Sequence, residues 1–369
     1  MMNLKYIQLY QISMPLKHPF ITHAGAVEDR EVILMEAVDE NGESGWGECV
    51  PFTTPFYTAE TIDTAWTLLT DLLIPRILSV PVEHPEDIKR RLDLYKGNQM
   101  AKAGAEAAIW DLYARQQKMS LAKCIGGVRD KVDAGVVISL GEDLEERLEE
   151  YEAAGYKRYK LKVDKGKERH LLEKVLSINP KLPLMFDGNG MYGEKDMDHL
   201  VSLDDLGLQM IEQPFPPGDF VLHRQLQQRM QTPICLDESI ESYHDAWQAI
   251  QLKSTEIINV KPGRVGGLTE ALSIHTLCAD DHIPLWCGGM LETGVGRAHN
   301  IALASLPQFT IPGDISASDR YYERDIITGK IEVTKGEVQV PEGCGTGVEM
   351  DREYVDFLTT RTLTLYKGD

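Results

Sequence analysis

The sequence predicts an α/β protein, a modified TIM barrel of the form (β/α)7β that carries an α+β capping domain. Three observations predict this fold. After Gly126-Gly127, eight short β-rich runs alternate with segments of helical spacing, which is typical of a parallel β/α barrel. Before that point, strand-like segments come first and helical segments follow. The chain has 369 residues, which fits a barrel of about 250 residues plus a smaller domain.

Residues 1–128 are expected to form the N-terminal part of the capping domain. Alternation of apolar and polar residues indicates strands, and Asn41-Gly42 indicates a hairpin turn between two of them. Residues 18–30, between the first two strands, resemble a mobile loop. The expected strands are 3–13, 31–38 and 44–48, and the expected helices are 58–78 and 101–117.

Residues 129–322 are expected to form the barrel, and residues 323–369 are expected to return to the capping domain. The last β-rich run leads into Pro312-Gly313-Asp314 and then into polar chain, so the eighth unit lacks its helix. In the tail, residues 331–340 have a strand-like pattern and are expected to join the first domain. The eight runs of the barrel are 132–139, 158–163, 184–187, 208–212, 234–237, 257–261, 284–287 and 309–311.

The composition is ordinary for a globular protein, with 43% hydrophobic and 26% charged residues. The formal net charge is −20, and such a surface repels nucleic acid and anionic membranes, so we expect neither as a partner. No segment approaches the roughly 18 to 20 apolar residues of a membrane span, and residues 1–18 lack the pattern of a signal peptide. The six cysteines are scattered without a C-x-x-C pair, which indicates reduced thiols and a cytoplasmic location.

Charged residues end five consecutive runs of the expected barrel, 24 or 25 residues apart: Lys162, Asp187, Glu212, Asp237 and Lys261. One β/α unit takes roughly 25 to 30 residues, so each charge should lie at the same level of its strand. That level is the C-terminal mouth, where this fold places active sites. A single strand-end charge usually caps a loop and faces solvent, but five in register, each after apolar residues, favour a site.

The three carboxylates of Asp187, Glu212 and Asp237 would repel one another without a cation. Asp and Glu oxygens that leave room for substrate oxygens suit Mg²⁺, with Mn²⁺ or another divalent cation as an alternative. A small-molecule carboxylate bound to the metal would hold its α-carbon between Lys162 and Lys261. Loss of the α-proton creates an enediolate, whose negative charge the metal would stabilise as a Lewis acid.

An ordinary lysine is a poor base at neutral pH, because its pKa is about 10.4 and must fall toward about 7 to 8 for efficient proton transfer. Lys160 lies two residues before Lys162 and should point to the same face of the strand. Both Lys160 and the metal would disfavour the ammonium form of Lys162. A solvated strand-end charge is the alternative reading of Lys160.

These residues resemble those of the enolase superfamily, muconate-lactonizing-enzyme subgroup, over nearly the whole chain. The motifs that carry the resemblance are Lys160-Leu-Lys162, Asp187-Gly-Asn189, Ile211-Glu-Gln-Pro214, Leu236-Asp-Glu-Ser239, Asn259-Val-Lys-Pro262 and, in the capping domain, Gly45-Trp-Gly-Glu48. Gly188 stands where an alanine is common in the family. Residues 261–267, 286–294 and 307–314 resemble, more narrowly, the branch of o-succinylbenzoate synthases and N-acylamino acid racemases.

The resemblance implies a Mg²⁺-dependent lyase that dehydrates 2-succinyl-6-hydroxy-2,4-cyclohexadiene-1-carboxylate in menaquinone biosynthesis. N-acylamino acid (N-succinylamino acid) racemisation is the alternative, or a second activity. Lys162 would remove the proton and return it to the leaving hydroxyl, and Lys261 would remain a cation. Arg264 fits the branch in which racemase activity occurs, although it could equally be a helix-entry charge. The resemblance also implies a homo-oligomer in a bacterial cytoplasm, and Asn189 and Glu238 as residues that orient the ligands.

Six residues are expected to contact substrate: Ser139, Phe20, Phe52, Tyr57, Gly289 and Met290. The three aromatic residues should cover the barrel mouth and exclude water, although packing between the domains would explain them equally well. The glycine permits close approach of substrate, and the methionine adapts to varied shapes. The serine ends the first barrel strand and could hydrogen-bond the acyl arm.

Three other functions are less consistent with the sequence. A sugar-acid dehydratase of the superfamily needs a histidine at the end of the seventh strand, where Trp286-Cys-Gly288 stands, and His299 lies well beyond it. A dipeptide epimerase usually has paired aspartates after the last strand, and Asp314-Ile-Ser316 has only the first. A catalytically inactive binding protein should have lost a ligand or a base, and none is missing.

Overall fold

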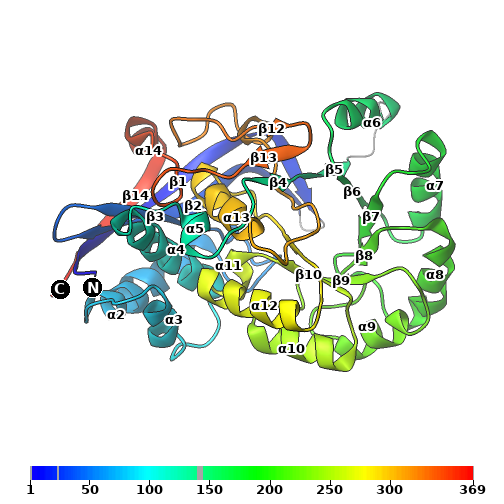
Figure 1. The fold of residues 1–369 in the computed structure, drawn as a ribbon, viewed down its shortest axis with the longest axis horizontal. Helices are drawn as coiled ribbons and strands as arrows, with labels where there is room; N and C mark the ends of the chain where they lie inside the picture. The colour runs from blue at the N-terminus through cyan, green and yellow to red at the C-terminus, as the bar shows by residue number, and fades with distance from the viewer. Residues whose placement is uncertain (1, 23–24, 139–143, 369) are drawn as a thin grey trace.

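The computed structural model describes residues 2–22, 25–138 and 144–368 and contains a curled parallel sheet of seven strands. Figure 1 shows this sheet on the right, with β5 at one end and helices around its outer face. The strand order β11-β10-β9-β8-β7-β6-β5 follows the chain, as in a β/α barrel. The strands are β5 (Gly135–Ile138), β6 (Arg158–Lys162), β7 (Leu184–Asp187), β8 (Met210–Glu212), β9 (Ile234–Leu236), β10 (Ile257–Val260) and β11 (Leu285–Cys287).

The gap between β11 and β5 is closed by a segment with isolated bridges. Leu285 of β11 pairs with Phe309, and Gly313 pairs with Ala134, just before β5. The (β/α)7β fold is therefore confirmed, although the eighth run is too short to count as a regular strand. Pro307 and Pro312 flank this run, and a proline cannot donate to a strand ladder.

Helices cover the outside of the barrel, and apolar side chains fill its inside. Met185, Met210, Cys235, Ile257 and Trp286 form the interior cluster. The outer elements are α6 (Leu144–Ala153), α7 (Glu168–Ile178), η2 (Glu194–Asp196), α8 (Met197–Ser202), η3 (Leu203–Leu206), α9 (Phe220–Gln227), α10 (Tyr243–Leu252), α11 (Pro262–Val265), α12 (Leu268–Asp280) and α13 (Gly294–Ala304). The 3-10 turn η4 (Ser318–Arg320) follows the barrel.

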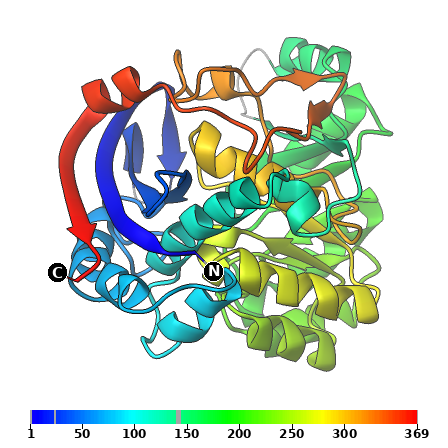
Figure 2. The same ribbon diagram turned by 60° about the vertical axis from the view of Figure 1, so that its left-hand side comes forward.

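A second, antiparallel sheet of four strands forms the cap, in the order β14-β1-β2-β3. The hairpin predicted at Asn41-Gly42 is confirmed, since it joins β2 to β3. Figure 2 shows β14, in red, curving beside β1, in blue. The elements of the cap are β1 (Leu4–Thr22), β2 (Gly25–Asp39), β3 (Ser44–Cys49), α1 (Ile62–Leu68), the π-helix η1 (Leu69–Leu73), α2 (Ile74–Leu78), α3 (Glu86–Leu92), α4 (Gln99–Gln116), α5 (Leu121–Cys124), α14 (Arg352–Leu358) and β14 (Thr359–Tyr366).

The prediction of a mobile loop at residues 18–30 is wrong. β1 continues to Thr22 and β2 begins at Gly25, and Phe20 pairs with Val27 across this hairpin. β14 pairs with β1 only as far as Ile12, and beyond it no described strand covers this edge of β1, although the Lys17 N–H donates to the Tyr321 oxygen at 2.9 Å. Prolines are tolerated at such an edge, because their missing N–H groups break no ladder.

The prediction that residues 331–340 join the first domain is also wrong. β12 (Val333–Thr334) and β13 (Glu337–Gln339) form a hairpin that pairs with β4 (Lys131–Asp133), next to the first barrel strand. Val338 lies opposite Val132, and both side chains are buried, which explains the pairing. The segment that pairs with the cap sheet is β14, with Tyr366 opposite Tyr6.

The Gly45-Trp-Gly-Glu48 motif connects the cap to the barrel. A Cβ at Gly45 would overlap the backbone of Leu112, and one at Gly47 would overlap that of Gly104, so the glycines let β3 lie directly on α4. Glu48 accepts hydrogen bonds from the backbone N–H of Thr293 (3.0 Å) and Gly296 (2.8 Å), at the start of α13. This contact fixes the barrel helix that follows β11 to the cap.

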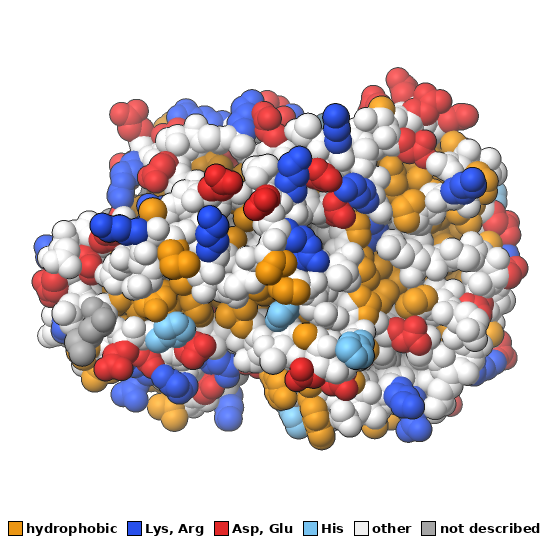
Figure 3. Space-filling model, in the orientation of Figure 1, with side chains coloured by type: hydrophobic (Ala, Val, Ile, Leu, Met, Phe, Trp, Pro, Cys, Tyr) orange, Lys and Arg blue, Asp and Glu red, His pale blue; other side chains and the backbone are white. Residues whose placement is uncertain are grey.

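Acidic and basic side chains are interspersed on the face in Figure 3, rather than gathered into one field of either sign. Within residues 2–22, 25–138 and 144–368, no helix combines the length and apolar character needed to cross a bilayer.

Candidate active site

The predicted charged residues meet at the C-terminal edge of the parallel sheet. Lys162 lies opposite Asp187 in the β6–β7 register, and Asp187 lies opposite Glu212 in the β7–β8 register. Asp237 and Lys261 come directly after β9 and β10. Lys162, Asp187 and Glu212 therefore start from one level of the sheet, as their spacing predicted. Glu212 lies opposite Cys235 and Leu236 lies opposite Ile258, so Asp237 and Lys261 start farther along their strands, toward the mouth.

The Lys160 ammonium lies between two of the carboxylates, 2.8 Å from Asp187 Oδ2 and 2.7 Å from Glu212 Oε2. Asp314 Oδ2, after the closing segment, lies 3.8 Å from the same nitrogen. Burial alone would lower the pKa of Lys160, but Asp187 and Glu212 outweigh burial and raise that pKa well above its ordinary value. Lys160 is thus a buried cation rather than a solvated strand-end charge.

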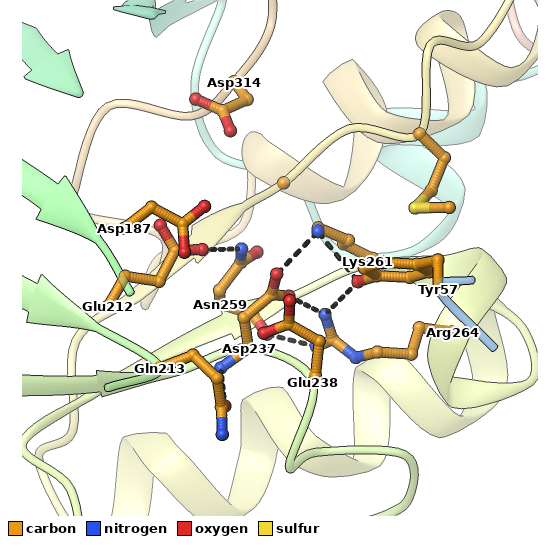
Figure 4. A network of polar contacts seen from close by, with 12 residues as sticks. Tyr57, Asp187, Glu212, Gln213, Asp237, Glu238, Asn259, Lys261, Arg264 and Asp314 are labelled. Carbon is orange, nitrogen blue, oxygen red and sulfur yellow. Dashed lines mark hydrogen bonds and ion pairs between the residues drawn. The ribbon is translucent and has the colours of Figure 1, made fainter. Parts of the chain in front are cut away.

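Asp237 holds the opposite end of the site together, as Figure 4 shows. Lys261 Nζ donates to Asp237 Oδ2 at 2.7 Å and to the Tyr57 hydroxyl at 2.9 Å, and Arg264 donates to Asp237 Oδ1. Burial would raise the pKa of Asp237, but Lys261 and Arg264 reverse this effect and lower it. Burial would lower the pKa of Lys261, yet Asp237 raises it, so Lys261 is held as an ammonium ion.

Lys162 has a different environment from Lys261. It is exposed at the mouth, forms no ion pair with any residue that the structure describes, and lies 5.2 Å from the centre of the Phe20 ring. Although solvent reaches the residue, the protein around its amine is dense enough that desolvation is the main cause of a lowered pKa. The positive charges of Lys160 and Lys261 lower this pKa further, while Asp187 opposes them.

Several buried oxygens at the site have no hydrogen-bond donor, which fits a divalent cation. These atoms are Glu212 Oε2, Glu238 Oε2 and Asn259 Oδ1. Glu212 Oε2 touches the Lys160 ammonium as an ion pair, but without the alignment of a hydrogen bond. Burial and the neighbouring charge of Asp187 raise the pKa of Glu212 and outweigh the opposing effect of Lys160, so the cations present do not fully compensate the buried carboxylates. Hard, acceptor-only oxygens of this kind are the ligands that Mg²⁺ prefers.

Within the described residues, no three Asp, Glu, His or Cys side chains are arranged as a ready coordination set. The reason is local. Lys160 lies between Asp187 and Glu212, while Lys261 and Arg264 pair with Asp237. A cation bound by the three carboxylates would have to take over part of these contacts.

Asn189 and Glu238, expected to orient the ligands, contact each other. Asn189 Nδ2 donates to Glu238 Oε1 at 3.1 Å, and the Asn189 backbone N–H donates to Asp187 Oδ1 at 3.0 Å. Asn189 has φ +42°, in the left-handed region that asparagine tolerates better than most residues. Its position therefore links the β7 carboxylate to the loop after β9.

The cap places its aromatic residues over the mouth. Phe20 and Phe52 stack with their planes 5° apart and ring centres 6.4 Å apart. The Tyr57 hydroxyl accepts a hydrogen bond from Lys261. Arg30 donates to the Met290 oxygen, after β11, and lies over the Phe52 ring, so it contacts both residues. Gly289 lies close to the Asp314 backbone, since a Cβ there would be 3.2 Å from the Asp314 oxygen. Ser139, the last of the expected substrate contacts, lies outside the described residues.

Sequence reasoning missed residues that support these groups. Asn259 Nδ2 donates to Glu212 Oε1 at 3.0 Å, and Gln213 Oε1 accepts from the backbone N–H of Asp237 (3.0 Å). Arg158 lies in the barrel interior, where it pairs with Asp314 and stacks on Trp286. The signal was present for Asn259 and Arg158, because each lies two residues before a site lysine on the same strand face.

Comparisons with known proteins agree with this architecture. Residues 6–126 match the family described as mandelate racemase / muconate lactonizing enzyme, N-terminal domain, and residues 143–355 match the family described as enolase C-terminal domain-like. The chain is 48% identical over 363 residues to an o-succinylbenzoate synthase of Bacillus subtilis (strain 168), covering 98% of each chain. It is 42% identical over 366 residues to an N-succinylamino acid racemase of Amycolatopsis sp, covering 97% of this chain and 98% of the other. A crystal structure of an enolase superfamily member from Listeria innocua Clip11262 has a TM-score of 0.97 at 40% identity, with 100% of each chain covered.

Proposed function

Because the chain belongs to the mandelate racemase / muconate lactonizing enzyme family of the enolase superfamily, we propose that it is an o-succinylbenzoate synthase. This lyase dehydrates 2-succinyl-6-hydroxy-2,4-cyclohexadiene-1-carboxylate, a small-molecule carboxylate of menaquinone biosynthesis. Racemisation of N-succinylamino acids is the second candidate, because a racemase at 42% identity aligns with nearly the whole chain. Enzymes of this family depend on a divalent metal ion, and we propose Mg²⁺ here, with Mn²⁺ as an alternative.

The observation that carries the proposal is the difference between the two lysines. Asp237 and Tyr57 hold Lys261 as an ammonium ion. Lys162 has no carboxylate partner among the described residues, and its pKa is lowered by desolvation. A dehydration needs one group that can accept a proton and one fixed positive charge, and this pair supplies both.

In the proposed reaction, the Lys162 amine removes the proton from C1 of the ring, the carbon that bears the carboxylate. The electron pair of that C–H bond forms the C1–C6 double bond, the C6–O bond breaks, and the ring becomes aromatic. The Lys162 ammonium returns the proton to the departing hydroxyl, which leaves as water. The Lys261 ammonium stabilises the negative charge that develops in between. A divalent cation held by Asp187, Glu212 and Asp237 would supply Lewis-acid stabilisation of the substrate carboxylate.

Two other reactions of the superfamily have less support. His299 contacts backbone carbonyls of Val295 and Ala107, so it is engaged between α13 and α4 and not at the barrel mouth. Asp314 is paired with Arg158, and Lys160 lies 3.8 Å away. A dipeptide ammonium group would have to compete with both cations for that carboxylate, which argues against epimerisation.

An assay of purified protein with Mg²⁺ and the cyclohexadiene carboxylate tests the proposal directly. We expect o-succinylbenzoate to form, Lys162→Ala to abolish turnover while substrate still binds, and Lys261→Ala to reduce turnover severely. Turnover that survives Lys162→Ala would remove Lys162 from the role of base. Absence of both synthase activity and α-proton exchange from N-succinylamino acids in D₂O would favour a binding protein instead. We further propose a bacterial cytoplasmic location. We also propose that the protein is a homo-oligomer, and size-exclusion chromatography with light scattering would test this oligomeric state.

A further inference from the structure

Arg30, at the cap–barrel junction, is buried, and the carboxylates of Glu48 and Glu292 act on it only from beyond ion-pair distance. It is 1% exposed and, in the part of the chain that the structure describes, forms no ion pair. Its guanidinium donates to four backbone oxygens, those of Glu31 (2.7 Å), Pro51 (2.7 Å), Val50 and Met290 (3.2 Å). Three of these belong to the cap, and Met290 belongs to the loop between β11 and α13.

Burying a guanidinium without an ion pair is unfavourable, and Arg30 Nε has no hydrogen-bond partner among the described residues. An apolar residue would fill the same space without this cost. The feature that an apolar residue could not supply is a simultaneous link between the cap carbonyls and the barrel loop.

The Arg30 guanidinium also begins a stacked series that ends at the barrel mouth. Its Cζ lies 4.4 Å from the centre of the Phe52 ring. Phe52 stacks on Phe20, and Lys162 Nζ lies 5.2 Å from the Phe20 ring centre. We call Arg30, Phe52 and Phe20 the aromatic column. The column joins Met290, on one side of the mouth, to the Lys162 amine.

The loop that carries Met290 has a conformation that needs external support. Leu291 has φ +59°, a left-handed backbone that bulky residues rarely adopt. The Tyr322 hydroxyl donates to the Leu291 oxygen at 2.6 Å, and the Met290 N–H donates to Glu292 Oε2 at 2.8 Å. Arg30 adds support from the cap through its hydrogen bond to the Met290 oxygen, while Glu48 holds the far end of the loop at Thr293.

We propose that Arg30 is a positioning residue, which fixes the Lys162 amine through Phe52 and Phe20 and fixes the opposite loop through Met290. This inference rests on the proposed function. Lys261 is held by Asp237 and Tyr57, independently of the column. Lys162 has no comparable ion pair, so the aromatic cover is its main restraint. Loss of Arg30 should therefore disturb the Lys162 side of the site more than the Lys261 side.

Hydrogen–deuterium exchange at the α-carbon of D- and L-N-succinylamino acids, followed by NMR in D₂O with Mg²⁺, separates the two sides. The enantiomer whose exchange is lost in Lys162→Ala reports on Lys162. We expect Arg30→Lys and Arg30→Met to slow exchange of that enantiomer about tenfold more than exchange of the other, because a misplaced amine loses reactivity steeply with distance. A role in folding alone would slow both enantiomers by the same factor.

Two further variants keep the test decisive if Arg30→Met does not fold. Phe20→Leu removes the ring at the mouth end of the column and should give the same imbalance between enantiomers. Arg361→Lys is the matched control, since this guanidinium also stacks on an aromatic ring of the cap, 4.2 Å from the centre of Trp66. An enantiomer ratio that stays at the wild-type value in both Arg30→Lys and Phe20→Leu would overturn the proposal.

Wild-type protein that exchanges the α-proton of neither enantiomer would count against the proposed function. A spectroscopic measurement tests the aromatic column even in that case. With 4-fluorophenylalanine at position 20, the ¹⁹F resonance should shift or broaden in Arg30→Lys and stay unchanged in Arg361→Lys. A resonance identical in wild type and Arg30→Lys would show that Arg30 does not position Phe20.

Discussion

Lys160 Nζ lies 2.7 Å from Glu212 Oε2, and both side chains are excluded from solvent. The same ammonium contacts Asp187, so two neighbouring carboxylates inside the barrel share the charge of one lysine. Removing one partner of a buried ion pair leaves the other charge without compensation, which costs about 3 to 5 kcal/mol. Lys160 therefore acts as an internal counter-ion for the residues that we propose as metal ligands.

We expect Lys160→Met to lower the free energy of unfolding by about 3 to 5 kcal/mol in the presence of EDTA. Mg²⁺ or Mn²⁺ should raise the melting temperature of this variant more than that of wild type, because the cation then meets no competing ammonium. Thermal and urea unfolding with and without metal measure both effects. Lys157→Met is the control, since Lys157 pairs with Asp133 and Glu337 at the surface, where such pairs contribute about 0 to 1 kcal/mol. Equal metal-induced shifts in wild type and Lys160→Met would refute the counter-ion role.

Glu106, on α4, should make stability depend on pH. Burial raises the pKa of Glu106 to about 7, although hydrogen bonds from Thr269 oppose the shift. Between the ordinary pKa of about 4.3 and about 7, the folded state binds more protons than the unfolded state, so stability falls as pH rises through this window. At 1.36 kcal/mol per pKa unit, the loss amounts to about 4 kcal/mol.

Glu106→Gln removes this titration, so its stability relative to wild type should increase from pH 5 to pH 8. Urea unfolding at several pH values measures the difference. Burial also raises the pKa of Glu48 to about 7, but Glu48 is present in both proteins and its contribution cancels in the comparison. A difference between the two proteins that does not change with pH would contradict the assignment to Glu106.

The Tyr57 hydroxyl, which accepts from Lys261 Nζ at 2.9 Å, should matter more for racemisation than for dehydration. In racemisation Lys261 must exchange a proton, whereas in dehydration it needs only to remain positive. Loss of this hydrogen bond in Tyr57→Phe costs about 1 kcal/mol, or roughly fivefold in rate. We expect α-proton exchange on the Lys261 side to fall by this factor, and synthase kcat to fall less. Tyr113→Phe, in the cap between His84 and Trp110, is the control, and a larger loss in synthase kcat than in exchange would reject the assignment.

Gly45→Ala should destabilise the cap, because the added Cβ would overlap backbone atoms of Ala108 and Leu112 on α4. Backbone cannot rotate away as a side chain can, so we expect a loss of about 1 to 3 kcal/mol in the free energy of unfolding. Gly329→Ala is the matched control, since a Cβ there meets no atom within 4 Å, and its effect should stay within about 0.5 kcal/mol. Equal stability of the two variants in urea would show that β3 can move away from α4.

Sequence spacing predicted the strand ends of the barrel well, because each β/α unit repeats with nearly constant length. The register that aligns Lys162, Asp187 and Glu212 follows directly from that repeat. Motif resemblance added Asn189 and Glu238, which lie in contact in the structure. Periodicity and motifs are local properties of the chain, and they succeed where local pattern decides the structure.

Other features depended on contacts between distant segments, which no local pattern reveals. Residues 18–30 look irregular in sequence, yet pairing across one hairpin makes residues 18–22 and 25–30 strand. The pairing of Lys160 with both carboxylates could not be foreseen either, since the spacing gives its face but not its rotamer. Arg30 was not singled out, because an arginine next to a strand is ordinarily exposed.

The pairing of β14 with β1 has a consequence for synthesis of the protein. Tyr6 and Tyr366 are direct partners, so in the cap sheet one segment pairs with another that is translated much later. The parallel strands of the barrel pair mostly with their sequence neighbours and can assemble earlier. Until β14 has been translated, the edge of β1 that it will cover is unpaired. Unpaired strand edges readily pair with other chains. Prolines at 15 and 19, and charged Lys17, lie on the stretch of β1 that β14 never covers, where they discourage such association.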